Sequence, residues 1–534
     1  EAMKANTTGA DNVAVGYRAL LSNTTASYNT AVGWAALNTN TTGANNTAVG
    51  RAVLGANTTG ANNTATGYNA LNANTTGSEN TAVGSSALYS NTTGVHNTAN
   101  GYQASYLNTT GANNSVNGYQ ALFFNTTGAN NTASGYRSLY ANTTGIRNTG
   151  NGVSTLQSNT TGNDNTASGM NALFGNTTGS FNTANGRNAL YSNTTASNNT
   201  ASGYLALFNN TTGDQNTAVG QGALAANTTG ANNTAVGKNA LDANTTGDQN
   251  VASGVNSLQD NTTGSYNVAS GVNSLGNNTT GTNNVAMGQG ALRLNTTASN
   301  NTAVGYGSLY ANTTGVENNA FGSGALSSNT TGYENVAMGR SAGFENTTGS
   351  RNTYVGDDAN QLNVTGSNNT VIGRFNGNQG GLNLTNTSNN VVISDGDGNI
   401  KFAYQSSGNT TKMPDVYTNT SSSAANVVIL ASGTICRSTS SLKYKRDVQD
   451  ATHGLAEVLQ LRPVTYKGKN AEDGDTVFGG LIAEEVHDAG LTEFVQYADD
   501  ETPDALAYSN MVSLCIKALQ ELSAKNDALE TQNA

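Results

Sequence analysis

Residues 40–56 have the sequence NTTGANNTAVGRAVLGA, and residues 57–73 repeat it as NTTGANNTATGYNALNA. The same pattern, N-T-T-G-x-x-N-T-A-x-G-x-x-A-L-x-x, extends from Asn6 to a last copy that begins at Asn363. There are 22 copies at a constant step of 17 residues, with no insertion or deletion between them. Short internal repeats of this kind are the signature of solenoid architectures, in which each repeat stacks on its neighbours.

The constant period predicts one coil of a β-solenoid per repeat. Loops tolerate changes of length because closure entropy grows slowly with loop length, whereas one extra residue in a stacked coil would move every side chain out of its column. Runs such as Thr47-Ala48-Val49 favour strands, two glycines per repeat would weaken a helix, and glycine supplies corners with positive φ. At about 4.8 Å per coil, the shaft would be roughly 105 Å long.

Two asparagines recur in every copy, and we expect each set to form a ladder of side-chain amides along the stack. The Asn-Thr-Thr triplets are also formal N-glycosylation sequons. We interpret them as structural, because a glycan on every coil would disrupt the stacked ladders. The first set includes Asn6, Asn23 and Asn40, and the second includes Asn12, Asn29 and Asn46.

The apolar content of each coil is small, with one leucine and a few alanines or valines. Burying a leucine contributes on the order of 1.5–3 kcal/mol, whereas ordering 17 backbone residues costs on the order of 17 kcal/mol or more. We therefore expect several chains to associate along the shaft and bury the leucine and alanine columns between them. The predicted assembly is a homotrimer.

The stretch Asn46–Gly50 and its copies resemble the Asn-Ser-Val-Ala-x-Gly repeats of trimeric autotransporter adhesin heads, which are trimeric β-rolls. The resemblance implies a similar architecture here. The predicted fold class is thus an all-β solenoid shaft of 22 coils, a trimeric β-roll or β-helix, followed by a small α+β domain that ends in a helix or coiled coil.

The position after the second glycine of the repeat is variable and often aromatic. Aromatic rings on a polar surface can stack on sugar rings, which would suit a glycan receptor. The rings can equally stack on one another along the shaft or pack between chains, and both interpretations stay open. The candidates for glycan contact are Tyr17, Trp34, Tyr68, Tyr102, Tyr119 and Tyr136.

Charge and composition argue against several classes of function. The chain has 22 Lys and Arg residues against 33 Asp and Glu residues, and residues 440–534 hold 17 of the acidic and 8 of the basic ones. No basic stripe is left for a phosphate backbone, so we expect no nucleic-acid partner. There is no long apolar run and no metal-ligand spacing of Cys or His. We expect no membrane insertion, no metal and no cofactor.

The register of the repeat breaks after Gly373, and from Ser440 the content of Leu, Glu and Lys rises. These changes divide the chain into a solenoid shaft over residues 1–375, a β-rich connector over 376–439 and a C-terminal domain over 440–534. Three stretches of this last domain resemble the intramolecular chaperone, called peptidase S74, at the end of phage tail spikes and fibres. They are residues 440–445, 461–464 and 480–486.

That resemblance implies a domain that trimerises nascent chains, starts the shaft in register and in many relatives then cuts itself off. It assigns Ser440 as the nucleophile and Lys445 as its base, with cleavage before Ser440. A serine needs such a base, and a lysine can act as one when its pKa is lowered. The family has Asp and Arg where this chain has Ser441 and Lys443. Self-cleavage and a chaperone that stays attached therefore both remain open.

The end of the chain predicts one long helix from about Ser509. Apolar residues and two asparagines at alternating steps of four and three indicate the seam of a short coiled coil, in which a polar residue would set the register. An ordinary amphipathic helix packed on its own domain is the alternative. The seam contains Leu519, Leu522, Asn526 and Leu529, together with Cys515 and Asn533.

The combined features predict a structural and host-recognition tail fibre of a bacteriophage or phage-like particle, located in the virion tail. Its partners would be two further copies of the chain, other virion or baseplate proteins, and a host cell-surface receptor, expected to be a glycan. A trimeric bacterial surface adhesin is the main alternative. A polysaccharide depolymerase would need an acid-bearing interruption of the repeats, and an ice-binding protein would show thermal hysteresis.

Overall fold

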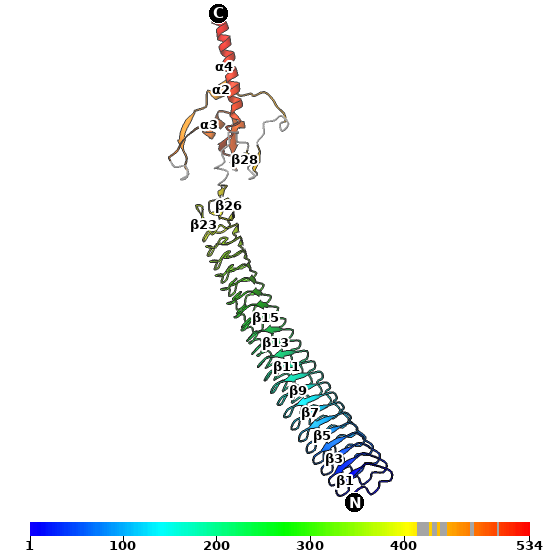
Figure 1. Cartoon of the computed structure of the whole chain (residues 1–534). Helices are drawn as coiled ribbons and strands as arrows, with labels where there is room; N and C mark the ends of the chain where they lie inside the picture. The colour runs from blue at the N-terminus through cyan, green and yellow to red at the C-terminus, as the bar shows by residue number, and fades with distance from the viewer. Residues whose placement is uncertain are drawn as a thin grey trace. The chain divides into compact units, whose positions relative to one another are not determined.

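The computed structural model describes residues 1–408, 410–413, 427–429, 435–437, 446–469, 475–498 and 501–533. The chain forms two compact units, Glu1–Thr420 and Ser421–Ala534. The first unit is a stack of coils that follow one another along the chain (Figure 1). This confirms the predicted solenoid with its 17-residue spacing and the small C-terminal domain.

Each repeat of the solenoid contributes one three-residue strand to a parallel sheet, and equivalent residues of successive coils pair with one another, as Thr47 does with Thr64. The strands are β1 (Val13–Val15), β2 (Thr30–Val32), β3 (Thr47–Val49), β4 (Thr64–Thr66), β5 (Thr81–Val83), β6 (Thr98–Asn100), β7 (Ser115–Asn117), β8 (Thr132–Ser134), β9 (Thr149–Asn151), β10 (Thr166–Ser168), β11 (Thr183–Asn185), β12 (Thr200–Ser202), β13 (Thr217–Val219), β14 (Thr234–Val236), β15 (Val251–Ser253), β16 (Val268–Ser270), β17 (Val285–Met287), β18 (Thr302–Val304), β19 (Asn319–Phe321), β20 (Val336–Met338), β21 (Thr353–Val355) and β22 (Thr370–Ile372).

The second glycine of the repeat turns the chain out of each strand. Gly50 has φ +130°, and a Cβ atom at this position would lie 2.1 Å from the carbonyl oxygen of Gly67 in the next coil. Only glycine fits a corner where two backbones approach so closely. The first glycine, for example Gly60, does not have positive φ, so the expectation of a positive-φ corner holds only for the second glycine.

The leucine of each repeat adopts a left-handed backbone conformation, as Leu54 does at φ +51°. Such a conformation costs a non-glycine residue roughly 1–2 kcal/mol. Two gains offset the cost. The Leu54 side chain is completely buried, and its N–H donates a 3.1 Å hydrogen bond to the carbonyl of Ala70 in the next coil. The left-handed turn therefore points the leucine into the coil.

The core of the shaft is closed within a single chain. Leu37, Leu54 and their equivalents have no exposed surface, and neither do strand alanines such as Ala48. The expectation that neighbouring chains bury the leucine and alanine columns is therefore wrong. The left-handed leucine and the central residue of the strand face the same interior, so one narrow coil suffices to exclude water from both columns.

The last coils depart from the consensus in a compensating way. Tyr354 occupies the alanine position of its strand and is fully buried. In the coil before it, Gly343 occupies the position of the column leucine. A Cβ atom on Gly343 would lie 2.6 Å from the Tyr354 ring, so the ring fills the space that a leucine would take. Its hydroxyl accepts a 3.0 Å hydrogen bond from Asn363, and burial raises the pKa of Tyr354.

After β22 the step between paired strands lengthens, because Thr370 pairs with Val391. The following elements are β23 (Asn378–Gln379), β24 (Leu382–Asn383), β25 (Val391–Ser394), β26 (Ile400–Gln405), η1 (Ser406–Gly408), β27 (Thr410–Lys412), β28 (Val427–Ile429) and β29 (Ile435–Arg437). Strand β25 continues the parallel sheet, and β26 and β27 add to it in antiparallel order. The division of the chain at residues 375 and 439 stays a prediction.

The second unit has a small core made by side chains from α3, η4, β32 and α4. The buried residues of this core are Val486, Leu491, Phe494, Val495, Met511 and Leu514. Besides β28 and β29, this unit contains α2 (Leu455–Val458), β30 (Val464–Lys467), β31 (Val477–Gly480), α3 (Ala483–Asp488), η4 (Thr492–Phe494), β32 (Val495–Tyr497), β33 (Pro503–Leu506) and α4 (Met511–Asn533). Among the described residues, none of the helices combines the length and the apolar content that a membrane span requires.

Candidate functional site

The first asparagine of the repeat forms a continuous chain of amide hydrogen bonds inside the shaft. Nδ2 of Asn23 donates to Oδ1 of Asn6 at 2.9 Å, and Nδ2 of Asn40 donates to Oδ1 of Asn23 at 3.0 Å. The series continues to Asn363, which donates to Asn346 at 2.8 Å. Because every amide donates towards the preceding coil, the ladder has one direction along the shaft.

The second asparagine forms a ladder of another kind. The backbone N–H of Asn29 donates to Oδ1 of Asn12 at 2.9 Å, and that of Asn46 donates to Oδ1 of Asn29 at 2.9 Å. Nδ2 of Asn46 then donates to the carbonyl of Gly60, which also accepts from the first-ladder residue Asn57. The two ladders therefore meet at the first glycine of the repeat, where a Cβ atom would collide with the Asn57 amide.

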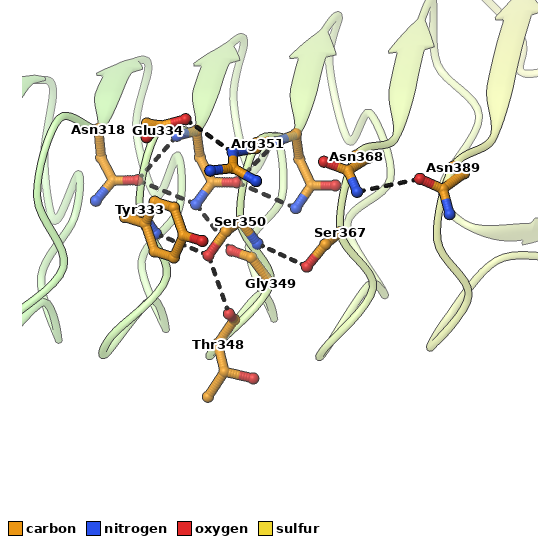
Figure 2. A network of polar contacts seen from close by, with 12 residues as sticks. Asn318, Tyr333, Glu334, Thr348, Gly349, Ser350, Arg351, Ser367, Asn368 and Asn389 are labelled. Atoms are coloured by element: carbon orange, nitrogen blue, oxygen red, sulfur yellow. Dashed lines mark hydrogen bonds and ion pairs between the residues drawn. The ribbon is translucent and has the colours of Figure 1, made fainter.

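Figure 2 shows the same pattern near the end of the shaft, where Asn318 accepts from the backbone of the next coil. A partly buried serine ladder runs beside it. The N–H of Tyr333 donates to Oγ of Ser350 at 3.1 Å, and the N–H of Ser350 donates to Oγ of Ser367 at 3.0 Å. An exposed ion pair joins Glu334 and Arg351 across two coils at 2.9 Å. These polar contacts hold neighbouring coils in register.

The six candidates for glycan contact lie on the surface and are 43–56% exposed. Their rings face one another or an arginine. Tyr102 stacks on Tyr119 and Tyr119 on Tyr136, each at 5.3 Å between ring centroids. Near the N-terminus Tyr17 stacks on Trp34 at 6.4 Å, and the guanidinium of Arg51 lies 5.1 Å from the Trp34 ring and 5.6 Å from the Tyr68 ring. Each of these rings therefore has a neighbour against at least one face, although the side chain as a whole stays partly exposed.

A second aromatic column is formed by the residue that directly follows the column leucine in each coil. Tyr89, Tyr106 and Phe123 stack at 5.1 Å per step, and Phe123 stacks on Tyr140 at 5.4 Å. Further along, the column includes Phe174, Tyr191 and Phe208. Each aromatic ring of these stretches thus serves as a contact surface for its neighbours.

A cavity between the two aromatic columns was not predicted from the sequence. It has a volume of about 410 Å3, and the residues that line it include Tyr306, Tyr310, Gly290 and Gly307. Its sequence signal is a run of glycines in three successive coils at the same repeat position, Gly290, Gly307 and Gly324, where nearly all other coils have larger residues. The aromatic residues alone did not reveal it, because aromatic residues recur at the same repeat positions in many other coils.

The proposed nucleophile Ser440 and base Lys445 lie outside the described residues, so their roles stay predictions. The described part of the chain contains no group of three His, Cys, Asp or Glu side chains that could hold a metal ion. His453 contacts Glu493 at 2.7 Å, and His487 contacts the hydroxyl of Tyr497 at 2.8 Å. Each of these histidines pairs with a single side chain of its own unit.

Two of the stretches that carry the chaperone resemblance meet in the second unit. Arg462 forms an ion pair with Glu485, and this hydrogen-bonded guanidinium holds the pKa of the Glu485 carboxyl below its usual value. Leu481 is held by Tyr508, whose hydroxyl accepts from the Leu481 N–H at 2.7 Å and donates to its carbonyl at 3.1 Å. The carboxylate of Glu521 on α4 accepts from the N–H of Leu455 at 2.9 Å and joins α4 to α2.

Helix α4 packs on its unit through Met511, Leu514 and Ala518. The leucines of the predicted seam lie in solvent, with Leu519 64%, Leu522 51% and Leu529 55% exposed, and Asn526 is also exposed. Two residues that the seam did not include, Val512 and Ile516, are 58% and 50% exposed. We call these five exposed apolar residues, Val512, Ile516, Leu519, Leu522 and Leu529, the α4 apolar face.

Residues 440–496 match the family model described as chaperone of endosialidase. No match was found among curated proteins or among solved structures. The matched residues include both stretches joined by Arg462 and Glu485. The chain thus combines a β-solenoid shaft with a C-terminal stretch that matches the chaperone of endosialidase family, and this combination fits a tail fibre with a C-terminal chaperone domain.

Proposed function

We propose that the chain is the subunit of a homotrimeric tail fibre of a bacteriophage or phage-like particle. In this proposal the C-terminal unit assembles three chains, and the shaft then reaches from the virion tail towards a host surface. The observation that carries the proposal is the presence, in one chain, of a 22-coil solenoid and a match to the chaperone of endosialidase family. A long rigid shaft and an assembly domain are the two parts that such a fibre needs.

The support for a trimer comes from α4 and not from the shaft. Burial of exposed apolar side chains against a partner stabilises the complex by about 25 cal/mol per Å2 of buried apolar surface. The α4 apolar face is such a surface, whereas the leucine and alanine columns of the shaft are already buried. Three copies of α4 would bury these faces against one another, with Asn526 setting the register as polar seam residues do.

The assembly is tested by comparing wild type with Ser440→Ala in intact mass and in gel migration with and without boiling. Under the proposal both proteins migrate as trimers when unheated. Loss of a fragment that matches residues 440–534 from wild type alone would assign self-cleavage to Ser440. If both chains stay whole and trimeric, the chaperone unit is a retained cap. Monomers in both samples would contradict the proposed assembly.

Host recognition is tested by binding of the labelled full-length fibre to a panel of bacterial strains. The proposal expects saturable binding to some strains and not to others, because receptors on cell surfaces differ between strains. Equal binding to all strains, or binding to none, would contradict a recognition role and leave the fibre as a structural spacer.

A further inference from the structure

The second aromatic column has a gap of one side chain at Ser327. The residue before it in the column is Tyr310 and the residue after it is Phe344, so a short serine stands between two aromatic residues. Elsewhere in the column successive rings stack at 5.1 Å per coil. Two coils therefore separate the rings on either side of the gap by about 10 Å, twice the spacing of stacked strands. One ring in van der Waals contact on both faces needs roughly 7–8 Å.

The floor of the gap is also open. A Cβ atom on Gly290 would lie 3.5 Å from the Tyr310 ring, and one on Gly324 would lie 3.3 Å from the Phe344 ring. Gly307, between them, would meet nothing within 4 Å. The rings of Tyr310 and Phe344 thus lean over the outer glycines, and the space above Gly307 is empty of protein atoms. This space forms the cavity of about 410 Å3, within the range typical of small-molecule sites.

Another coil shows what kind of group this space accepts. Tyr136 and Tyr140 occupy the same repeat positions as Tyr306 and Tyr310, and Arg137 lies between them. The Arg137 guanidinium is 5.4 Å from the Tyr136 ring and 4.9 Å from the Tyr140 ring. A flat group with polar edges therefore fits between the two aromatic columns. In the cavity, Gly307 replaces the arginine and leaves the equivalent place to a ligand.

The polar residues at the cavity decide between possible occupants. Arg293 also lines it, with Nη1 donating to the Tyr310 hydroxyl at 3.2 Å, and its positive charge disfavours a cation. Asn273 and Gln289 add amide groups, which both donate and accept hydrogen bonds. Tyr306 is 66% exposed and offers a ring to the same space. An aromatic ligand would leave these polar groups unpaired, whereas a sugar has C–H faces for the rings and hydroxyls for the edges.

We propose that this cavity, which we name the Ser327 notch, binds one pyranose ring of a glycan. The ring would lie between Tyr310 and Phe344 with a face towards Tyr306, and its hydroxyls would pair with the Ser327 hydroxyl within the gap and with the Gln289 amide at its edge. The inference rests on the proposed host-recognition function and names the part of the shaft that carries it. The proposed site of glycan contact is thus the place in the second aromatic column where Ser327 replaces an aromatic residue, and not the stacked rings of the N-terminal coils.

The test uses saturation-transfer difference NMR of the full-length chain with glucose, galactose, mannose, N-acetylglucosamine and glucuronic acid, and with p-cresol as an aromatic probe. Ser327→Tyr completes the aromatic column and fills the notch with a residue that the column already carries in other coils. Gln157→Tyr is the matched control, because Gln157 also stands between two aromatic residues, Tyr140 and Phe174, but does not line the notch. Tyr306→Ala removes one ring from the notch.

The expected result is saturation transfer to at least one sugar in wild type and Gln157→Tyr, and its loss in Ser327→Tyr. Tyr306→Ala should weaken binding roughly two- to tenfold, the effect of one lost aromatic contact. No sugar signal in wild type, equal signals in Ser327→Tyr and Gln157→Tyr, or signal from p-cresol alone would each overturn the assignment.

Cell binding separates this inference from the function on which it rests. If Ser327→Tyr fibres bind bacterial strains as wild type does, host recognition stands and the notch is not its site. If wild-type fibres bind sugar at the notch but distinguish no strains, the notch stands as a sugar site and the recognition function fails.

Discussion

The shaft and α4 treat their apolar side chains in opposite ways. Along the shaft, the column leucines have no exposed surface, although each coil is only 17 residues long. On α4, five large apolar side chains are at least half exposed. Exposed apolar patches of this kind mark interaction surfaces. The difference indicates that the shaft folds on contacts within its own chain, and it supports the proposal that chains assemble through α4.

The largest effect is expected from placing charges on the α4 apolar face. Leu519→Asp combined with Leu522→Asp should abolish the trimer, because two carboxylates would have to be buried without partners. Light scattering after size exclusion measures the assembly. Gln520→Asp combined with Ala524→Asp puts the same charges on another side of α4 and should leave the trimer intact. If the variant with Leu519→Asp and Leu522→Asp is still a trimer, the chains do not assemble through the α4 apolar face.

The next largest effect concerns the buried column of the shaft. Leu292→Ala should destabilise its coil by about 2–5 kcal/mol, because it leaves a cavity in a core that the same chain closes. Leu294→Ala, two residues away at a half-buried position, should cost much less. Hydrogen exchange resolved along the chain is the appropriate measurement, since stacked repeats open locally. Equal effects of the two substitutions would contradict burial of the column within one chain.

A smaller effect is expected from breaking one ladder. Asn210 donates to Asn193 at 2.9 Å and accepts from Asn227 at 2.8 Å, so Asn210→Ala leaves two buried amides each without one partner. The expected cost is about 1–3 kcal/mol for each unpaired group. Asn209→Ala, at the adjacent exposed position, should leave exchange rates of this coil unchanged. If both variants exchange alike, the ladder does not hold the coils together.

The smallest effect is a pH dependence of the second unit. The pKa of Glu485 is lowered by Arg462, so this pair stabilises the fold above the ordinary glutamate pKa of about 4.3, and the stabilisation is lost as the pH falls through the lowered value. The α-helices of the described part lie in this unit, so circular dichroism at 222 nm follows its unfolding. Arg462→Gln should flatten the acid dependence slightly. Lys467→Gln, which removes a surface ion pair with the almost fully exposed Asp475, is the control.

The period of the repeat was enough to predict the solenoid, because stacking forbids insertions and a register of 17 residues is visible in the letters alone. The closed core was not predictable in the same way. It depends on the left-handed backbone of the leucine, and a leucine is a residue for which that conformation is uncommon. The sequence also contains Gly343 and Tyr354 as two separate departures, but only the fold shows that the tyrosine fills the space of the absent leucine.

The candidate sites were also predictable from the sequence only in part. Repeat positions predicted where the aromatic residues lie on the shaft, but whether a ring is covered depends on the residue one coil away. The Ser327 notch could have been found by aligning the copies and looking for small residues beside aromatic ones in adjacent coils. Ser440 and Lys445 were assigned by resemblance to a family, and no spacing within this sequence could replace that assignment.

The direction and constant step of the asparagine ladders have a consequence for the length of the shaft. Gain or loss of 17 codons adds or removes one whole coil and leaves every remaining amide with its partner, because each ladder Asn bonds only within its own coil and to the two adjacent coils. The reach of the shaft can therefore change in steps of about 4.8 Å without a new core having to evolve. Recombination between the near-identical copies would supply such steps, so the number of repeats in the gene sets the length of the shaft.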